Sequence, residues 1–259
     1  MTTRPQAVAG MFYEADPQQL QQHVDALLEG ATAPQPTPRG LIVPHAGYIY
    51  SGGTAAAAYR CLANARGQIR RVALFGPAHR VYLQAMALPS VDAFATPLGR
   101  VALDRDAMAQ VAGLPGVCIS DEAHRLEHSL EVQLPFLQRV LGEFQLVPVV
   151  VGHCPSREVA DVIDALWAMP DTLLVVSTDL SHFHDYETAN RLDRATCDRL
   201  QARATDLQGE DACGAAVLNG LMRSRQARSL TTELLERCNS GDTAGNRDKV
   251  VGYGSFVLH

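Results

Sequence analysis

The sequence lacks any long run of a single residue class. No segment approaches the roughly 20 consecutive apolar residues that cross a bilayer, and the start has no apolar stretch typical of a secretory signal. Lysine and arginine form no block, and 22 basic against 28 acidic residues give a formal charge of -6. The sequence therefore offers no electrostatic footprint for a nucleic-acid phosphate backbone. We expect a cytoplasmic protein that binds neither membranes nor nucleic acid.

Several well-known motifs are also absent. The six cysteines lie far apart and include no C-x-x-C pair, which excludes the usual structural zinc and dithiol motifs. The chain has no glycine loop that would cradle a phosphate and no G-x-S-x-G elbow. Nucleotide-dependent and serine-hydrolase mechanisms therefore have the least support. We expect the cysteines to be reduced thiols.

What is present is the composition of an ordinary folded protein. Hydrophobic residues make up 47% of the 259 residues and charged residues 19%, which is typical of globular domains. No Pro/Gly/Ser-rich break, composition shift or internal repeat divides the chain. We predict one domain over residues 1–259.

Apolar strands alternate with amphipathic helices along this chain. Strands are predicted at residues 40–44, 71–75, 85–88, 99–103, 145–151, 172–176 and 250–258. Helices are predicted over residues 17–28, 51–62, 127–141, 156–169, 187–204 and 211–223, with a short one after residue 104. Pro135 should kink or restart the helix at 127–141. Asp16 and Pro17 are typical of a helix start, and a linker with three prolines spans Ala31 to Pro38. This alternation indicates a three-layer α/β/α sandwich around a mainly parallel or mixed sheet.

Polar residues follow several of the predicted strands. His45, His79 and Asp179 each come just after a strand, and ligands of α/β sheets bind beyond the carboxyl ends of strands. Two nearby clusters add side chains that can titrate or bind metal: His128, Glu131 and His182.

The histidines can be interpreted in two ways. Any one of them could simply cap a helix or bond a loop carbonyl. Together, however, several lie at strand ends beside Gly or Pro, which favours one polar, metal-binding pocket. His153-Cys154 also follows a strand, but adjacent residues in an extended loop point apart and Pro155 leads into a helix. We interpret that pair as structural.

Five motifs follow one another along the chain: Pro44-His45-Ala46-Gly47-Tyr48, Gly76-Pro77-Ala78-His79, the segment Glu127–Pro135, Ser177-Thr178-Asp179-Leu180-Ser181-His182, and Cys213-Gly214. In series they resemble the Memo family, called AmmeMemoRadiSam system protein B in bacteria and archaea. The resemblance runs from about Arg4 to His259.

The resemblance implies a fold similar to the LigB-type class III extradiol dioxygenases, which use non-haem iron. It also implies that His45, His79 and Cys213 match metal-binding positions, whereas Asp179 and His182 match polar residues lining the same pocket. His128 and Glu131 belong to the family's signature. By the same resemblance, an AMMECR-type protein and a radical S-adenosylmethionine enzyme are the expected partners.

Two imidazoles and one anionic ligand leave coordination positions open for water, oxygen or substrate. A thiolate where iron dioxygenases carry a carboxylate makes the site softer, so Cu and Zn are alternatives to Fe(II). The sequence also departs from the family after Gly214, where Ala215-Ala216-Val217 replaces a bulkier polar residue and a proline. This difference alters the expected pocket wall but keeps the thiol.

Three functions are compatible with these residues. The first is a mononuclear iron enzyme, redox or oxygen-dependent, in which His182, oriented by Asp179, handles protons and His128 assists. The second is a binding protein that keeps the pocket but performs no chemistry. The third is metal-assisted hydrolysis, with Asp179 or His128 activating water on zinc.

Overall fold

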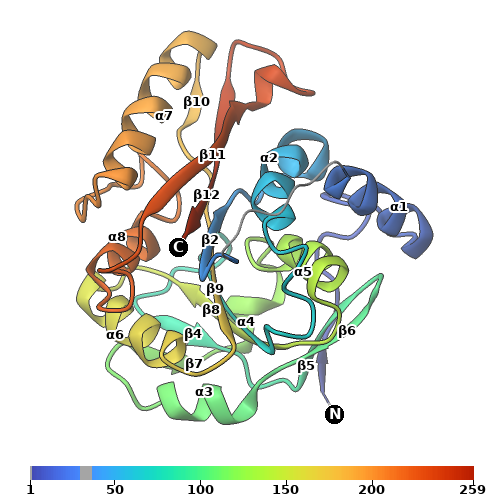
Figure 1. The fold of residues 1–259 in the computed structure, drawn as a ribbon, viewed down its shortest axis with the longest axis vertical. Coiled ribbons are helices and arrows are strands. Elements are labelled where there is room, and N and C mark those ends of the chain that lie inside the picture. The colour runs from blue at the N-terminus through green and yellow to red at the C-terminus, as the bar shows by residue number, and fades with distance from the viewer. Residues whose placement is uncertain (1, 30–36) are drawn as a thin grey trace.

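Helices lie on both sides of a large mixed sheet in the computed structural model of this chain, which describes residues 2–29 and 37–259 (Figure 1). The predicted three-layer α/β/α architecture is confirmed. Except for Thr37 and Pro38, the linker predicted at Ala31 to Pro38 lies outside the described residues.

The main sheet contains β2 (Gly40–Val43), β3 (Arg71–Pro77), β4 (Met86–Leu88), β7 (Val117–Ile119), β8 (Gln145–Val151), β9 (Thr172–Ser177), β10 (His182–His184), β11 (Thr232–Asn239) and β12 (Val250–Leu258). Their order is β10-β12-β2-β9-β3-β8-β4-β7, and β11 pairs with β12. The central strands β2, β9, β3 and β8 are parallel. Because helices cover both faces, these four strands are almost continuously buried.

The helices are α1 (Pro17–Leu28), α2 (Tyr48–Arg60), α3 (Arg105–Val111), α4 (Asp121–Arg125), α5 (Leu134–Leu141), α6 (Ser156–Trp167), α7 (Tyr186–Gln201) and α8 (Ala215–Arg223), with 3-10 turns at Glu131–Gln133 and Ser240–Asp242. Helices α1, α2 and α5 contact one another, and α2 packs on β2, β11 and β12. Helices α6 and α8 pack together and on β3, while α7 lies along β10, β11 and β12. Figure 1 shows these two groups on opposite sides of the strands.

Local chemistry explains the first helix. The side chain of Asp16 accepts a hydrogen bond from the Gln19 amide, and Pro17 occupies the first helical position. Leu20 and Val24 are its fully buried residues. The start predicted for this helix is confirmed.

Four details of the predicted elements are corrected. Residues 127–130 are not helical, because the Glu127 carboxylate bonds the Ser129 amide within this segment, and α5 begins only at Leu134, one residue before Pro135. Helix α8 begins at Ala215, so residues 211–214 form a loop. Helix α2 begins at residue 48 rather than 51, and strand β11 was not predicted.

The predicted strand at residues 99–103 lies outside the main sheet. Strand β6 (Gly99–Ala102) pairs with β5 (Ala93–Thr96), which pairs with β1 (Thr3–Arg4) to form a separate three-stranded sheet. This small sheet ties the N-terminal segment to the middle of the chain.

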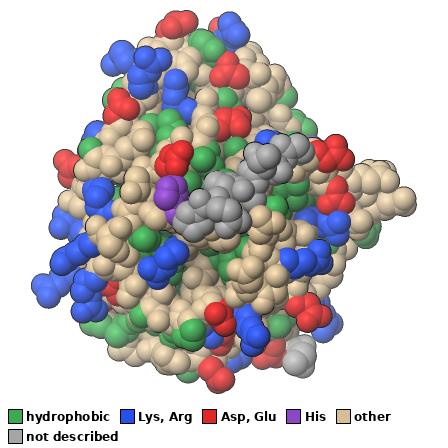
Figure 2. Space-filling view, viewed as in Figure 1, with side chains coloured by type: hydrophobic (Ala, Val, Ile, Leu, Met, Phe, Trp, Pro, Cys, Tyr) green, Lys and Arg blue, Asp and Glu red, His purple; other side chains and the backbone are tan. Residues whose placement is uncertain are grey.

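Basic and acidic side chains are interspersed over the face of the molecule shown in Figure 2. No helix within residues 2–29 and 37–259 combines the length and apolarity needed to span a membrane.

Candidate functional site

The carboxyl ends of β2, β9 and β3 carry the predicted strand-end residues. These strands are adjacent and parallel, in that order, so their carboxyl ends lie at one edge of the sheet. His45 follows β2, Asp179 follows β9, and His79 follows β3. The register of the sheet thus brings together three segments that are far apart in sequence.

Three imidazoles form a cluster at this edge. One nitrogen from each of His45, His79 and His128 lies within 4.8 Å of the other two. The ring centroids of His79 and His128 are 4.7 Å apart and stacked, and His45 meets both rings edge-on, at 5.1 and 5.4 Å. His45 is buried, His128 is half-buried, and His79 is the most exposed of the three. Solvent therefore reaches the cluster from the His79 side.

Hydrogen bonds fix which nitrogen of His45 is free. Ser177 Oγ donates to the carbonyl of Ser129 at 2.6 Å and accepts from Gln133 Nε2 at 2.9 Å. Because its single proton is used in the bond to Ser129, Ser177 Oγ can only accept a hydrogen bond from His45 Nδ1, which lies 2.9 Å away. His45 then carries its proton on Nδ1 and presents an unprotonated Nε2. Burial and the neighbouring imidazoles also hold the pKa of His45 well below its usual range.

A carboxylate orients His79 in the same way. Glu127 accepts from His79 Nδ1 at 2.9 Å, from the His79 amide at 2.6 Å and from the Ser129 amide at 2.9 Å. Burial opposes ionisation of Glu127, but the hydrogen bonds and His79 outweigh it and lower its pKa to about 2. An ionised carboxylate on Nδ1 leaves Nε2 of His79 as the free nitrogen, an arrangement typical of metal-binding histidines.

The close approach of β3 to this loop depends on Gly76. A Cβ atom there would lie 2.8 Å from both Ser129 Oγ and Leu130 Cδ2. Such contacts are too short for any other residue unless the Ser129 and Leu130 side chains shift. Glycine at this position therefore lets these two side chains pack directly against β3.

Of the three imidazole rings, that of His128 is the least constrained by hydrogen bonds. Its Nδ1 lies 3.4 Å from Glu127 Oε1 but has no hydrogen-bond partner in the part of the chain that the structure describes, although the atom is buried. Burial lowers the pKa of His128 to about 4, so the ring is neutral at neutral pH. The Phe12 ring packs against it with centroids 4.8 Å apart. A buried, unpaired and neutral imidazole is the state in which histidine binds a metal.

Cys213 lies beside the cluster. Its Sγ is 3.3 Å from His45 Nε2 and accepts from the Asp179 amide at 3.2 Å. Burial, with Asp179 nearby, raises the pKa of Cys213 to about 12, so the free group is a thiol. It would have to lose that proton to bind a metal.

Asp179 contacts His45 rather than His182. Its Oδ1 accepts from the His45 amide at 2.7 Å, and its Oδ2 lies 3.9 Å from His45 Nε2. Burial raises the pKa of Asp179 to about 7. His182, at the start of β10, is half-buried, and burial lowers its pKa. Within residues 2–29 and 37–259, no hydrogen bond joins these two side chains, so the orientation of His182 by Asp179 expected from the sequence is not seen.

Glu131 points elsewhere. Its buried carboxylate accepts hydrogen bonds from the guanidinium of Arg4, the amides of Ala7 and Val8, and the hydroxyl of Tyr13. This signature residue therefore anchors the N-terminal segment.

The donor set fits a transition metal. Three imidazoles, two with their outer nitrogens committed to Ser177 and Glu127, present nitrogens within 4.8 Å of one another. Metal–nitrogen bonds of about 2.0–2.1 Å place one ion within reach of such a group after small side-chain rotations. Imidazole binds Fe, Cu and Zn alike, and a thiolate shifts the preference toward softer ions.

Two residues that matter for this geometry are not among the site residues that the sequence predicts. They are Glu127, which directly precedes His128 within one of the motifs, and Ser177. Adjacency to His128 was the signal for Glu127. Nothing local distinguished Ser177, because its role depends on three residues from other segments.

Comparisons with known proteins agree on one family. The family described as "Memo-like protein" matches residues 4–257. The chain is 32% identical to a MEMO1 family protein of Methanopyrus kandleri over 279 residues, covering 98% of both chains. It is 32% identical to one of Aquifex aeolicus over 271 residues, covering 100% of both. It is 34% identical to one of Methanothermobacter thermautotrophicus over 275 residues, covering 98% of this chain and 99% of the relative.

A solved structure has a similar fold. The crystal structure of an uncharacterized protein from Escherichia coli K12 superimposes with a TM-score of 0.52, covering 84% of this chain and 98% of the other. Its sequence identity is 12%, so this similarity concerns the α/β fold alone.

Proposed function

This chain belongs to the Memo-like protein family, and from that premise we propose that it is a mononuclear non-haem iron oxidoreductase. His45 and His79 hold the metal in this proposal, with Cys213 and His128 as the further donors. The observation that carries the proposal is the group of three imidazole nitrogens within 4.8 Å of one another. When bound there, such an ion supplies Lewis-acid and redox chemistry at positions open to oxygen or substrate.

The surrounding residues support binding by keeping the donors in their metal-binding form. Ser177 and Glu127 commit the Nδ1 atoms of His45 and His79, which prevents either ring from turning away. Burial keeps His45 and His128 neutral, so binding an ion displaces no proton from these rings. Iron is the proposed metal because the resemblance to extradiol dioxygenases implies it, and Cu or Zn remain the alternatives.

Proton transfer is assigned to side chains beside the cluster. His182 is half-buried, and its lowered pKa leaves it neutral and able to accept a proton at neutral pH. Oδ1 of Asp179 accepts from the His45 amide and Oδ2 lies 3.9 Å from His45 Nε2, so the carboxyl has one fixed position facing His45. These two groups handle protons independently, because no hydrogen bond links them.

Metal analysis after anaerobic reconstitution with Fe(II) tests the proposal. About one iron per chain should remain after desalting, and the iron should be lost in His45→Ala and His79→Ala. His23→Ala is the matched control, since His23 lies on α1, where it pairs with Glu14, outside the cluster. Oxygen uptake with catechols and small phenols should then require His45. Iron retained in His45→Ala, or zinc bound with no oxygen uptake, would refute the iron oxidoreductase.

Metal-assisted hydrolysis is the second candidate, and the position of Asp179 favours it. A buried carboxyl with one oxygen 3.9 Å from His45 Nε2 could serve as a base for water on zinc. Zinc-dependent cleavage of activated esters that disappears in Asp179→Asn would support this reading over the first.

A further inference from the structure

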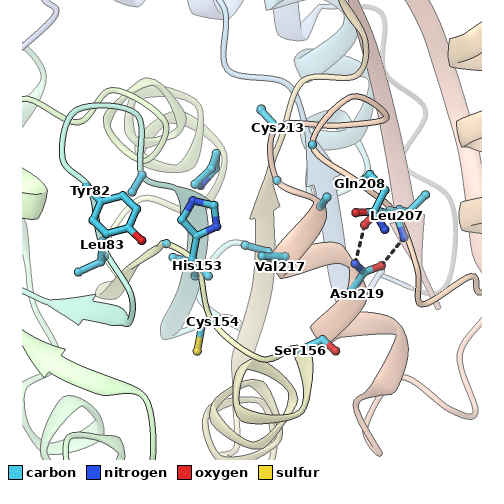
Figure 3. Close-up of a pocket in the computed structure, with 18 of the residues that line it drawn as sticks. Tyr82, Leu83, His153, Cys154, Ser156, Leu207, Gln208, Cys213, Val217 and Asn219 are labelled. Atoms are coloured by element: carbon cyan, nitrogen blue, oxygen red, sulfur yellow. Dashed lines mark hydrogen bonds between the residues drawn. The ribbon is translucent and has the colours of Figure 1, made fainter.

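A hollow lies beside the histidine cluster, on the far side of Cys213. It has a volume of about 590 Å³ and lies between the loop after β3, the loop after β8 and the segment that leads into α8 (Figure 3). That volume is within the range of pockets that enclose most of a small organic molecule. Cys213, one of the proposed metal donors, lines the hollow, and its Sγ lies 3.3 Å from His45 Nε2, so this side chain borders both the hollow and the histidine cluster.

The walls of the hollow are fixed by backbone contacts. The amide of Gly152 donates to the carbonyl of Ala85, and the amide of His153 donates to that of Leu83. A Cβ atom at Gly152 would lie 2.0 Å from the Leu83 carbonyl oxygen, so only glycine allows the two loops to meet. On the opposite wall, the Asn219 side chain donates to the Leu207 carbonyl and accepts from the Leu207 amide. The hollow is therefore preformed.

The hollow has no ionic side chain on its walls. Its nineteen lining residues include no Asp, Glu, Lys or Arg, whereas charged residues make up 19% of the chain. Glu158 is not among them and lies behind Cys154, with its Oε2 3.4 Å from the thiol. A charged molecule would meet no side chain of opposite charge on these walls, and a charge removed from water without such a partner costs several kcal/mol.

Aromatic and apolar groups supply the remaining contacts. The rings of Tyr82 and His153 lie 5.7 Å apart at one side of the hollow, where Figure 3 shows both. Leu83 and Val217 add apolar surface. Flat aromatic molecules stack favourably on such rings. His153 and Cys154, which the sequence indicated were structural, both line this hollow.

We propose that this hollow binds an uncharged aromatic molecule, or the uncharged ring of a larger one, beside the metal site. Naming that molecule as the substrate rests on the proposed function, but binding to the hollow does not require a metal. The inference thus names the class of ligand, neutral and ring-shaped, that binds in the hollow beside Cys213 and the histidine cluster.

Three probes of one shape and different charge test the inference. Benzamide, benzoate and benzamidine are nearly isosteric and are neutral, anionic and cationic at pH 7. We expect benzamide to bind with a dissociation constant on the order of 1 mM, and the two ions at least about tenfold more weakly. Ligand-observed NMR or calorimetry measures this on the protein as purified, with the metal content determined on the same sample.

Two filling variants locate the binding. Ala216→Trp and Ser156→Trp introduce a ring from different walls of the hollow, and each should abolish benzamide binding. Ala63→Trp, on the exposed turn after α2, is the control and should bind like the wild type. Thermal melts monitored by circular dichroism verify that each variant is folded. If one filling variant does not fold, the other one provides the test.

The outcomes separate this inference from the proposed function. Selective benzamide binding that is lost on filling supports the hollow, whatever metal is found. No benzamide binding, equal binding of the three probes, or binding that survives both folded filling variants overturns the inference. If the protein binds iron but gives one of those results, the proposed function stands and only the inference about the hollow fails. If benzamide binds selectively but no metal binds, the inference stands and the proposed function fails.

Discussion

His79 Nδ1 lies 2.9 Å from Oε1 of Glu127, and the same carboxylate also accepts from the His79 amide at 2.6 Å. The ring and the backbone of one residue are thus held by one acidic side chain from another segment. Losing such a partner typically lowers metal affinity about 10–100-fold, because the ligand is no longer oriented.

Replacing Glu127 with Gln should therefore weaken iron binding by about 10–100-fold without abolishing it. An amide has the shape of the carboxylate but lacks the charge that keeps the proton on Nδ1 of His79. Competition with a chromophoric chelator measures the affinity. Glu122→Gln is the control, because Glu122 is exposed and pairs only with Arg125. Wild-type affinity in the Glu127 variant would show that this contact does not orient a ligand.

Ser177→Ala should reduce both stability and metal affinity. The change removes one hydroxyl that serves His45, Gln133 and Ser129, and it leaves buried polar groups unpaired. A loss of about 1–3 kcal/mol in the free energy of unfolding is expected from such unpaired groups, and His45 becomes free to change tautomer. Urea denaturation of the metal-free protein measures the stability, and chelator competition measures the affinity. Loss of stability with unchanged affinity would separate the structural effect from the effect on His45.

The choice between His128 and Cys213 as third ligand is open to a direct comparison. His128→Ala and Cys213→Ala should each lower iron affinity, since the three imidazoles lie within 4.8 Å and the thiol is 3.3 Å from His45 Nε2. With Co(II) as a spectroscopic substitute, a thiolate ligand produces a sulfur-to-metal charge-transfer band in the near ultraviolet. That band should be absent in Cys213→Ala and present in His128→Ala. A wild-type spectrum without the band would remove Cys213 from the ligand set.

Glu131→Gln should destabilise the fold with little direct effect on the metal. The carboxylate is buried and pairs with Arg4, which is also buried. Breaking one partner of a buried pair typically costs about 3–5 kcal/mol, because the remaining charge is uncompensated. Urea denaturation should show this loss, against a change of less than about 0.5 kcal/mol for the exposed control Glu122→Gln. An equally small loss of stability in Glu131→Gln and Glu122→Gln would contradict the anchoring role of Glu131.

Stability should fall as the pH is lowered from about 6.5 toward 4.5, in part because of His124. This buried ring donates from Nε2 to the Ala87 carbonyl, and burial lowers its pKa from 6.5 to about 4. In this window the unfolded chain binds a proton at His124 that the folded chain does not, so the stability contribution present at high pH is lost on acidification. The contribution is roughly 2–3 kcal/mol.

Comparing the wild type with His124→Gln isolates this group from the other buried histidines. Glutamine keeps a donor for the Ala87 carbonyl but does not titrate. Urea denaturation at several pH values should therefore show a shallower decline for the variant. Parallel curves for the two proteins would mean that His124 does not cause the pH dependence.

Local signals in the sequence determined most elements and the family. Alternating apolar strands and capped helices indicated the α/β layers, because periodicity and caps act over a few residues. The strand-end positions of His45, His79 and Asp179 followed from the rule that the carboxyl ends of parallel strands share an edge. The helix predicted through residues 127–130 was wrong because the Glu127 side chain bonds the Ser129 amide there.

Only the tertiary structure decided which of these residues meet. Glu127 contacts His79 across 48 positions of the chain, and Ser177 reaches His45 across 132. The same packing turned Glu131 toward Arg4, placed His128 in the imidazole cluster, and enclosed a hollow without charged walls beside Cys213. Such contacts depend on strand order and on close approach at Gly76, neither of which a pattern of neighbouring residues encodes. The sequence therefore identifies which residues can bind a metal or transfer a proton, whereas the packing of distant segments decides which residues they contact.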